Sequence, residues 1–303
     1  QKGVLRAQHL DLHLCRRSID HAVQAALMQA LLQLGVDRGQ PAMRTLLLKA
    51  FALFLLTGCT TVGSNVPRAI AITIAEGVYM LPGSSGAADD KNLGRIGNAG
   101  FIVGDSGVIA VDTGTSHAHG QALLAAIRAV TDKPIKLALL THTRPEFLFG
   151  GTAFREQGIP IRTHQAMARL MAARCETCLK TLRQTVGEVP MLGTTMYKPD
   201  QAFDDTHELT QIGRTVRVLY FGHSSGPGDI AVFDAASGVL FAGGMVDVQR
   251  VPDTQDSNLE GWHRALKSLR ELPIKTVVPG HGAAAPASAI ADVQTYLAQL
   301  EAR

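Results

Sequence analysis

After its first 58 residues, the chain carries almost no net charge. Residues 59–303 contain 22 Lys and Arg against 23 Asp and Glu, a net charge of −1, although the whole chain carries +3. Nucleic-acid-binding surfaces need clustered positive charge, so we expect no nucleic-acid partner. Charged residues make up 18% of the chain and hydrophobic residues 46%, a balance that favours a globular protein over a disordered one.

Cysteine is also rare, with four in 303 residues. Cys175 and Cys178 form a single C-x-x-C in residues 167–182, a stretch with the apolar spacing of an amphipathic helix. A zinc ribbon would need a second pair, and positions three apart on a regular helix do not easily meet disulfide geometry. We therefore interpret these cysteines as structural or incidental thiols, and a thiol-dependent function stays as an alternative.

No apolar run is long enough to span a bilayer as a stable helix. The most apolar segment, residues 46–56, has about the length of a signal-peptide core and follows Met43-Arg44. It ends in Leu-Thr-Gly-Cys59, which resembles the bacterial lipobox, whose cysteine receives lipid. We therefore expect an exported protein anchored to a bacterial membrane through Cys59, facing the periplasm or the cell exterior. A buried helix with a chance ending is the alternative.

This interpretation divides the chain into four parts. Residues 1–42 would lie upstream of the mature protein, 43–58 would form the lipoprotein signal peptide, 59–68 a tether and 69–303 the folded domain. Within the last part, short β-rich runs alternate with helical stretches such as 119–130 and 165–185. Two β-rich halves with attached helices predict an α+β or α/β fold of two facing sheets with helices outside, although periodicity alone also allows one open sheet.

Five motifs follow predicted strands, where a rigid scaffold can hold polar side chains in place. In chain order they are VDTG (111–114), THTRPEFLFGG (141–151), GHSSGPGD (222–229), LFAGG (240–244) and PGHG (279–282). Their order and spacing resemble the metallo-β-lactamase superfamily over about residues 76–283. Shorter phrases resemble the quinoprotein-associated zinc metallohydrolases within it, namely ARC (173–175), GTTM (193–196) and GW (261–262).

The resemblance implies a four-layer αβ/βα sandwich, the metallo-β-lactamase fold, with a site at one edge of its two sheets. Such a site holds two zinc or iron ions and a bridging water that acts as the nucleophile. Three histidines match ligand positions of the family, and Glu146 stands in place of an aspartate; the histidines are His142, His223 and His281.

Three further ligand positions are lost. Phe147 has no lone pair, and Gly244 has no side chain where the family has a bridging carboxylate. Arg144 replaces a histidine, and a guanidinium keeps its proton and cannot coordinate a metal. At about 4 Å it would repel a divalent cation by about 8 kcal/mol for an effective dielectric near 20. A full dinuclear centre is therefore not expected.

Two interpretations remain. In the first, a single zinc or iron ion is held by His142, Glu146, His223 and His281, and Arg144 and Glu146 act on an anionic substrate. In the second, Arg144 replaces the metal, pairs with Glu146, and the pocket binds a small anion without hydrolysing it. The first describes a hydrolase-like lipoprotein, and the second a non-catalytic binding or accessory protein of the cell envelope.

Other polar residues near the motifs are expected to play supporting parts. Asp112 should support the site from behind its ligands or cap a turn. His117 and His119 have no carboxylate at ligand spacing, so they are expected at a solvated helix start. Residues 82–98 and 246–257 form the loops in which we expect the determinants of ligand choice.

Overall fold

The computed structural model describes residues 69–302, which form two facing β-sheets. The first sheet has seven strands in chain order: β1 (Ile72–Ala75), β2 (Val78–Leu81), β3 (Ala99–Val103), β4 (Val108–Val111), β5 (Ile135–Leu139), β6 (Ile161–His164) and β7 (Gln201–Phe203). The second has six strands in the order β13 (Ala285–Pro286), β12 (Thr276–Pro279), β11 (Val239–Gly243), β10 (Ile230–Asp234), β9 (Val216–Tyr220) and β8 (His207–Leu209).

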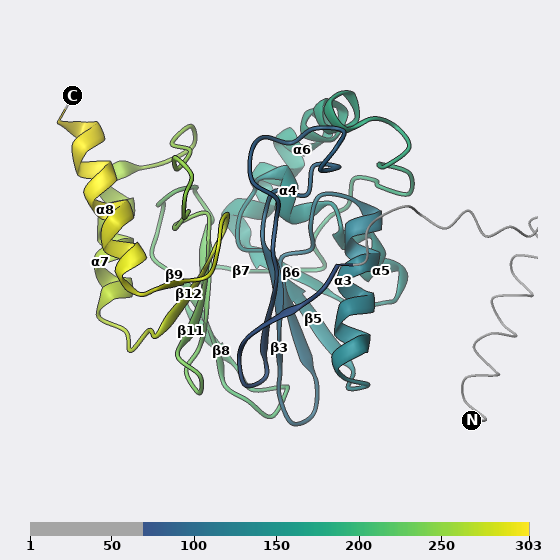
Figure 1. The fold of residues 1–303 in the computed structure, drawn as a ribbon, viewed down its shortest axis with the longest axis horizontal. Helices are drawn as coiled ribbons and strands as arrows, with labels where there is room; N and C mark the ends of the chain where they lie inside the picture. Colours follow the sequence, from purple (N-terminus) through teal and green to yellow (C-terminus); the bar gives the residue numbers. More distant parts are fainter. Residues whose placement is uncertain (1–68, 303) are drawn as a thin grey trace, which may run out of the picture. The chain divides into compact units, whose positions relative to one another are not determined.

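Helices cover the outer face of each sheet (Figure 1). Against the first sheet lie α3 (His117–Val130), α4 (Pro145–Leu148), α5 (Gly151–Glu156) and α6 (Gln165–Val186). Against the second lie α7 (Leu259–Arg270) and α8 (Ser288–Glu301). Among the described residues, no helix is both long and apolar enough to cross a membrane.

Three apolar clusters separate the four layers. Ile109 and Leu137 of the first sheet meet Val218 and Ile230 of the second in the middle cluster. One outer cluster joins the first sheet to α3, α5 and α6, and the other joins the second sheet to α7 and α8 around the fully buried Trp262. Burying apolar area on both faces of each sheet stabilises this arrangement. The predicted four-layer αβ/βα sandwich is confirmed.

Strand β5 leads into the longest motif, and its burial matches its apolar sequence. In β5, only Lys136 is exposed, and the other four residues are buried on both faces of the sheet. The chain leaves this strand at Leu140 and runs directly into Thr141 and His142. Gly243, at the end of β11, approaches the Thr141 side chain so closely that a Cβ there would lie 2.5 Å from its Oγ1. The strand ends of the two sheets therefore meet at one edge.

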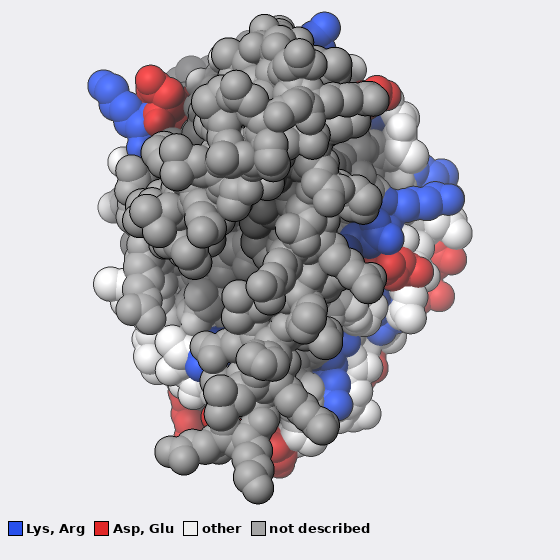
Figure 2. Space-filling model, turned by 90° about the vertical axis from the view of Figure 1, so that its right-hand side faces the viewer, with Lys and Arg blue, Asp and Glu red and all other residues white. Residues whose placement is uncertain are grey.

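Charged side chains are mixed by sign on the visible surface. In the part of Figure 2 that belongs to described residues, basic and acidic side chains lie next to one another along the rim. Ion pairs among the described residues include Arg155 with Asp200 at 3.6 Å and Arg183 with Glu188 at 3.5 Å. The predicted signal segment and Cys59 lie outside the described residues, so their assignment stays a prediction.

Candidate functional site

Asp112 anchors the loop that carries His142. It follows β4 with a φ of 57° and accepts two hydrogen bonds from Thr141, from the backbone N–H at 2.8 Å and from Oγ1 at 2.7 Å. Burial raises the pKa of the Asp112 carboxyl to about 7, although both hydrogen bonds oppose that shift. The side chain thus fixes the residue before His142, in the supporting position that the sequence indicated.

His142 occupies the space that a side chain at position 244 would need. A Cβ on Gly244 would lie 2.7 Å from His142 Nδ1 and 2.8 Å from its Cε1, closer than real Cβ contacts allow. The imidazole is buried, and its Nδ1 lies 2.7 Å from Asp229 Oδ2, although the angles there do not make a hydrogen bond. The residue that would supply the family's bridging carboxylate is therefore a glycine here, and the space for its side chain is occupied by His142.

Phe147 fills the space between two of the predicted ligands. Its fully buried ring meets the His142 ring edge-on, with centroids 5.8 Å apart, and the His281 ring likewise at 5.3 Å. Such edge-to-face contacts between rings are favourable. The chain has thus replaced a ligand with an apolar contact that packs the two histidines.

His281 lies between two carboxylates. Its Nδ1 is 2.8 Å from Asp247 Oδ1, and its Nε2 is 3.1 Å from Glu146 Oε1. Burial favours the neutral imidazole, but Asp247 and Glu146 outweigh it and raise the pKa of His281 above its ordinary value. Burial would raise the pKa of Glu146, but the hydrogen bond and charge of His281 and the charge of Arg144 hold it below its usual value. Each ring nitrogen of His281 therefore faces a carboxylate oxygen.

Arg144 does not pair with Glu146, which corrects the second sequence interpretation. Its Nη2 lies 2.9 Å from Asp253 Oδ2 and donates to the Asp253 carbonyl at 3.1 Å. The Arg144 side chain is 18% exposed. Glu146 has His281 as its partner instead. Arg144 therefore reaches the loop of residues 246–257.

His223 is not brought together with the other predicted metal ligands. It is exposed, and its Nε2 lies 2.7 Å from the Asp256 carbonyl, a contact in which the ring nitrogen donates. Within residues 69–302, no group of three or more His, Cys, Asp or Glu side chains is arranged to hold a metal ion. The predicted set of His142, Glu146, His223 and His281 is therefore not assembled in this structure.

The residues present do not fit a dinuclear metal centre. Phe147 packs where a ligand is needed, His142 takes the space beside Gly244, and His281 uses both nitrogens on carboxylates. Both ring nitrogens of His142, and Asp229 Oδ1, are buried without a hydrogen-bond partner among the described residues. These atoms are the remaining candidates for a ligand to a single ion.

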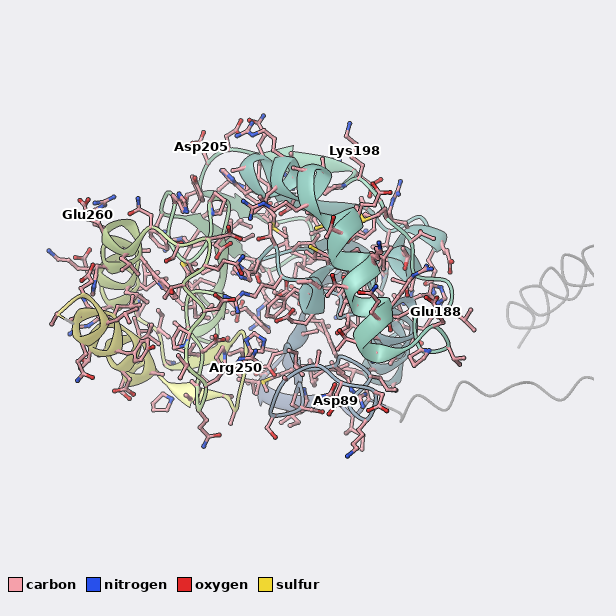
Figure 3. All side chains as sticks on the ribbon, turned by 90° about the horizontal axis from the view of Figure 1, so that it is seen from above. Asp89, Glu188, Lys198, Asp205, Arg250 and Glu260 are labelled. Carbon is pink, nitrogen blue, oxygen red and sulfur yellow. The ribbon has the colours of Figure 1, made fainter. Side chains whose placement is uncertain are left out.

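A cavity of about 400 Å³ opens beside this site. The motif loop lines it with His142, Arg144 and Glu146, and α6 forms another wall. The loop between β11 and α7 closes it with Arg250, Asp253 and Asp256; Figure 3 labels Arg250 on this loop. Three arginines thus line one cavity, and the third of them is Arg174 from α6.

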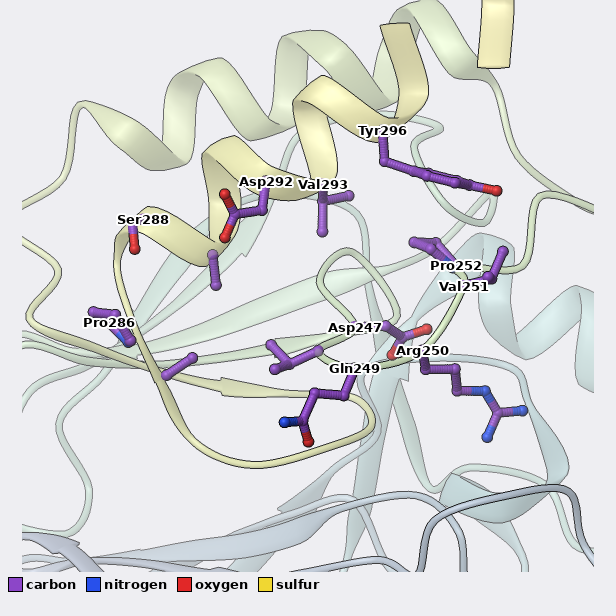
Figure 4. A pocket seen from close by; sticks show the side chains of 13 residues that line it. Asp247, Gln249, Arg250, Val251, Pro252, Pro286, Ser288, Asp292, Val293 and Tyr296 are labelled. Atoms are coloured by element: carbon purple, nitrogen blue, oxygen red, sulfur yellow. The ribbon is translucent and has the colours of Figure 1, made fainter. Parts of the chain in front are cut away.

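A second cavity, of about 450 Å³, lies between the same loop and α8 (Figure 4). Its lining is largely apolar and includes Val248, Val251, Val293 and Tyr296, and the carboxylates Asp247 and Asp292 also line it. Arg250 lines both cavities. The two spaces therefore share one loop residue, and the Arg250 guanidinium donates from Nη1 to the Gly86 carbonyl at 3.2 Å.

Sequence reasoning missed most partners of the site residues. Asp247, Asp253 and Asp256 lie in a loop that was expected to set ligand choice, but nothing in its composition singles out these carboxylates. Asp229 ends the GHSSGPGD motif and could have been found there. His119 was expected to be solvated and is instead 5% exposed, with the pKa of its ring lowered to about 4 by burial and by Arg95.

Solved structures of metallo-beta-lactamases have the same fold. A metallo-beta-lactamase from Pontibacter korlensis superposes with a TM-score of 0.63 at 20% identity, covering 76% of this chain and 99% of that one. The DIM-1 metallo-beta-lactamase superposes with a TM-score of 0.60 at 16% identity, covering 77% and 99%. At this identity, the likeness concerns the fold alone.

Sequence comparison points to the same family. A curated protein, the linear primary-alkylsulfatase of Pseudomonas sp. (strain ATCC 19151), is 24% identical over an alignment of 217 residues that covers 60% of this chain. The chain spans about 40% of that relative's length. The family model described as the metallo-beta-lactamase superfamily matches residues 93–281, more than half of the chain. The chain therefore belongs to the metallo-beta-lactamase superfamily.

Proposed function

We propose that this chain is an anion-binding member of its superfamily, with a hydrolase-like fold but without two-metal hydrolysis. The observation that carries the proposal is that Arg144, Arg174 and Arg250 line one cavity, beside a site where Phe147 packs against His142 and no side chain fits at Gly244. Guanidinium groups present several donors in a plane and suit carboxylate, sulfate and phosphate oxygens.

The charges around the cavity favour a ligand with a single negative charge. Three carboxylates, Glu146, Asp253 and Asp256, line it together with the three arginines. Arg144 and Arg174 each already have one of these acids as a partner, at 2.9 and 2.7 Å. Because these six charges sum to zero, the carboxylates oppose added negative charge, and a dianion is opposed more strongly than a monoanion such as a carboxylate or a sulfate monoester, which can use the remaining guanidinium donors. The alkylsulfatase relative supports the sulfate ester.

The adjoining apolar cavity suits an organic ligand with a nonpolar part. Because Arg250 lines both spaces, a charged group beside Arg144 and Arg250 would leave its apolar part facing Val248 and Val251. Burial of that part adds about 0.8 kcal/mol for each methylene group. We therefore propose a monoanionic amphiphile, such as a short alkyl sulfate, as the ligand class.

A second candidate, a hydrolase with a single metal, is favoured by one observation. His142 Nε2 and Asp229 Oδ1 are buried without partners among residues 69–302, as expected of atoms that hold an ion. Elemental analysis of the purified protein separates the candidates. Stoichiometric zinc or iron that is lost in a His142→Ala variant would support the hydrolase and contradict the metal-free proposal.

Two further features of the sequence support proposals about where the protein acts. We propose export and lipid anchoring at Cys59, so that the cavity faces the periplasm or the exterior. We also propose a position near the quinoprotein-associated metallohydrolases, supported by the ARC, GTTM and GW phrases. An accessory role in the cell envelope would follow from both.

Calorimetric titration with octyl sulfate tests the anion proposal. Arg144→Ala should weaken binding about tenfold or more, the loss of a charge-assisted hydrogen bond worth about 1.5–3 kcal/mol. Arg264→Ala is the matched control, because Arg264 pairs with Glu260 on the outer helix α7, away from the cavity. Equal affinities in the parent and Arg144→Ala would refute the proposed role of Arg144.

A further inference from the structure

A third cavity, of about 460 Å³, lies between the first sheet and the start of α3. Its walls come from β1, from the loop between β2 and β3, from the VDTG turn and from the first turns of α3. Most of the lining is aliphatic and includes Ile70, Ile72, Leu81, Ala99 and Leu123. No carboxylate is among the described residues that line it. This cavity therefore differs in character from the one lined by three arginines and three acids.

His119 brings a polar ring to this apolar wall. The residue is 5% exposed, and neither of its ring nitrogens has a hydrogen-bond partner among residues 69–302. Thr113 also lines the cavity, but its Oγ1 already bonds to the Phe147 carbonyl at 3.1 Å and to the Leu148 carbonyl at 2.7 Å. Buried polar atoms in proteins are almost always paired, because leaving them unpaired is unfavourable. The His119 ring therefore needs a partner, and the cavity is the space beside it.

The packing of α3 fixes the position of this ring. Ser116 caps the helix and accepts a hydrogen bond from the His119 backbone N–H at 3.4 Å. A Cβ on Gly120 would lie 2.1 Å from the Gly150 carbonyl oxygen, so the helix lies directly against the start of α5. Gly114, at a φ of 85°, likewise lets the VDTG turn approach the His119 Cβ. The first turn of α3 thus holds the ring at the cavity wall.

The ring is neutral at neutral pH. Burial and the charge of Arg95, which also lines the cavity, lower the pKa of His119 to about 4. A neutral imidazole has one nitrogen that donates and one that accepts, and a hydroxyl group can pair with either of them. A carboxylate can only accept, and burying its charge among aliphatic side chains is more costly than burying a hydroxyl.

We propose that this cavity is a second ligand site, for a small apolar molecule that carries one hydroxyl group, such as a phenol. The hydroxyl forms a hydrogen bond with the His119 ring, and the apolar part contacts Ile72, Leu81 and Leu123. An apolar lining with a few polar groups that set orientation is usual for sites of small molecules. The cavity shares no lining residue with the one beside Arg144, so the inference does not depend on the proposed anion binding.

The test is calorimetric titration of the full-length protein with 4-ethylphenol and with ethylbenzene, which lacks the hydroxyl. His119→Phe should weaken binding of 4-ethylphenol about tenfold or more, because the hydroxyl would be buried without a partner. The same variant should leave the affinity for ethylbenzene unchanged. His119→Gln, whose amide both donates and accepts, should recover most of the loss. His263→Phe on α7 is the matched control and should bind both molecules as the parent does.

Three results would overturn the proposal in these titrations. They are an unchanged affinity of His119→Phe for 4-ethylphenol, an equal loss for both molecules, and tighter binding of 4-ethylbenzoate than of 4-ethylphenol by the parent. The last result would show that the cavity selects an anion through Arg95 instead.

A measurement on the parent protein alone remains decisive if a substitution impairs folding. With ¹⁵N-labelled histidine, saturating 4-ethylphenol should shift the ring-nitrogen resonances of one histidine, and these are the resonances that His119→Gln lacks. Histidine resonances that do not change on addition of 4-ethylphenol would overturn the proposal without any variant.

Discussion

The His142 imidazole lies so close to Gly244 that no side chain fits at position 244, since a Cβ there would lie 2.7 Å from the ring nitrogen Nδ1. In a dinuclear member of the superfamily, one of these positions would supply a histidine ligand and the other a carboxylate. Here, position 244 is a glycine, and the His142 ring occupies the space that a carboxylate side chain would need. The two changes in sequence thus belong to one packing arrangement.

Adding a single methyl group should therefore destabilise the protein. We predict that Gly244→Ala lowers the free energy of unfolding by about 1–3 kcal/mol, the usual result of overpacking a dense interior. Urea unfolding of the parent protein and the variant measures this difference in the free energy of unfolding. In a His142→Ala background, the same change should cost much less, because the ring is gone. An equal cost in both backgrounds would show that the ring is not the obstacle.

Removing the acid that pairs with Arg144 should strengthen anion binding. Asp253→Asn takes one negative charge from the cavity wall and frees the guanidinium that Asp253 Oδ2 contacts at 2.9 Å. We expect octyl sulfate to bind about three- to tenfold more tightly, a gain of about 1 kcal/mol at a partly exposed site. Asp205→Asn, in an exposed loop away from both cavities, is the control. Weaker binding by Asp253→Asn would contradict an electrostatic role.

The apolar cavity predicts a dependence on chain length. From ethyl to octyl sulfate, affinity should rise about fourfold for each added methylene, the equivalent of about 0.8 kcal/mol. Val293→Asp places a charge among the apolar lining residues and should flatten this series without changing the affinity for ethyl sulfate. If the affinity of the parent protein does not depend on chain length, the apolar cavity does not bind the alkyl chain. That result would leave the anion site unaffected.

Stability should fall as the pH drops through the titration range of His119. Its folded-state pKa, near 4, lies below the ordinary value of 6.5, so between these values the unfolded chain binds the extra proton. Stability from this residue is therefore present above about pH 6.5 and lost toward pH 4, by up to about 3 kcal/mol.

His119→Phe, which keeps an apolar ring in the buried position, should reduce that loss. Thermal unfolding at pH 7 and pH 5 measures the difference between the two proteins. His263→Phe is the control, since His263 lies on α7 in contact with Glu301 near the chain's end. If both variants keep the parent's full pH dependence, His119 is not its source.

The lipid anchor predicts incorporation of a lipid precursor. Cells that express the protein should label it with radioactive palmitate, and Cys59→Ser should abolish the label, whereas Cys15→Ser should not. Labelling that persists in Cys59→Ser would refute the anchor.

The sequence predicted the layers of the fold because the strands carry their own signal. Periodicity alone left one open sheet possible, and it was the resemblance carried by the five motifs that implied two sheets with a site at one edge. The motifs also located His142 and His281, which follow β5 and β12, and Glu146, which lies in the short helix α4. Asp112 could be assigned a supporting role for the same reason.

The pairing of side chains could not be predicted in the same way. Arg144 and Asp253 are 109 positions apart, and they meet only because of the path of an irregular loop. His223 occupies a ligand position of the motif, but its rotamer is set by the Asp256 carbonyl of that same loop. His119 is buried by the packing of α3, which the pattern of a first helical turn does not reveal. Each of these contacts depends on tertiary packing rather than on local pattern.

The central claim is that the cavity binds an organic monoanion without the help of metal ions. The direct measurement is calorimetric titration of octyl sulfate into protein that has been treated with a chelator and shown by elemental analysis to contain no zinc or iron. The account predicts saturable one-to-one binding that is unchanged by the treatment and weakened by Arg144→Ala but not by Arg264→Ala. Binding that disappears with the metal and returns when zinc or iron is restored would contradict it.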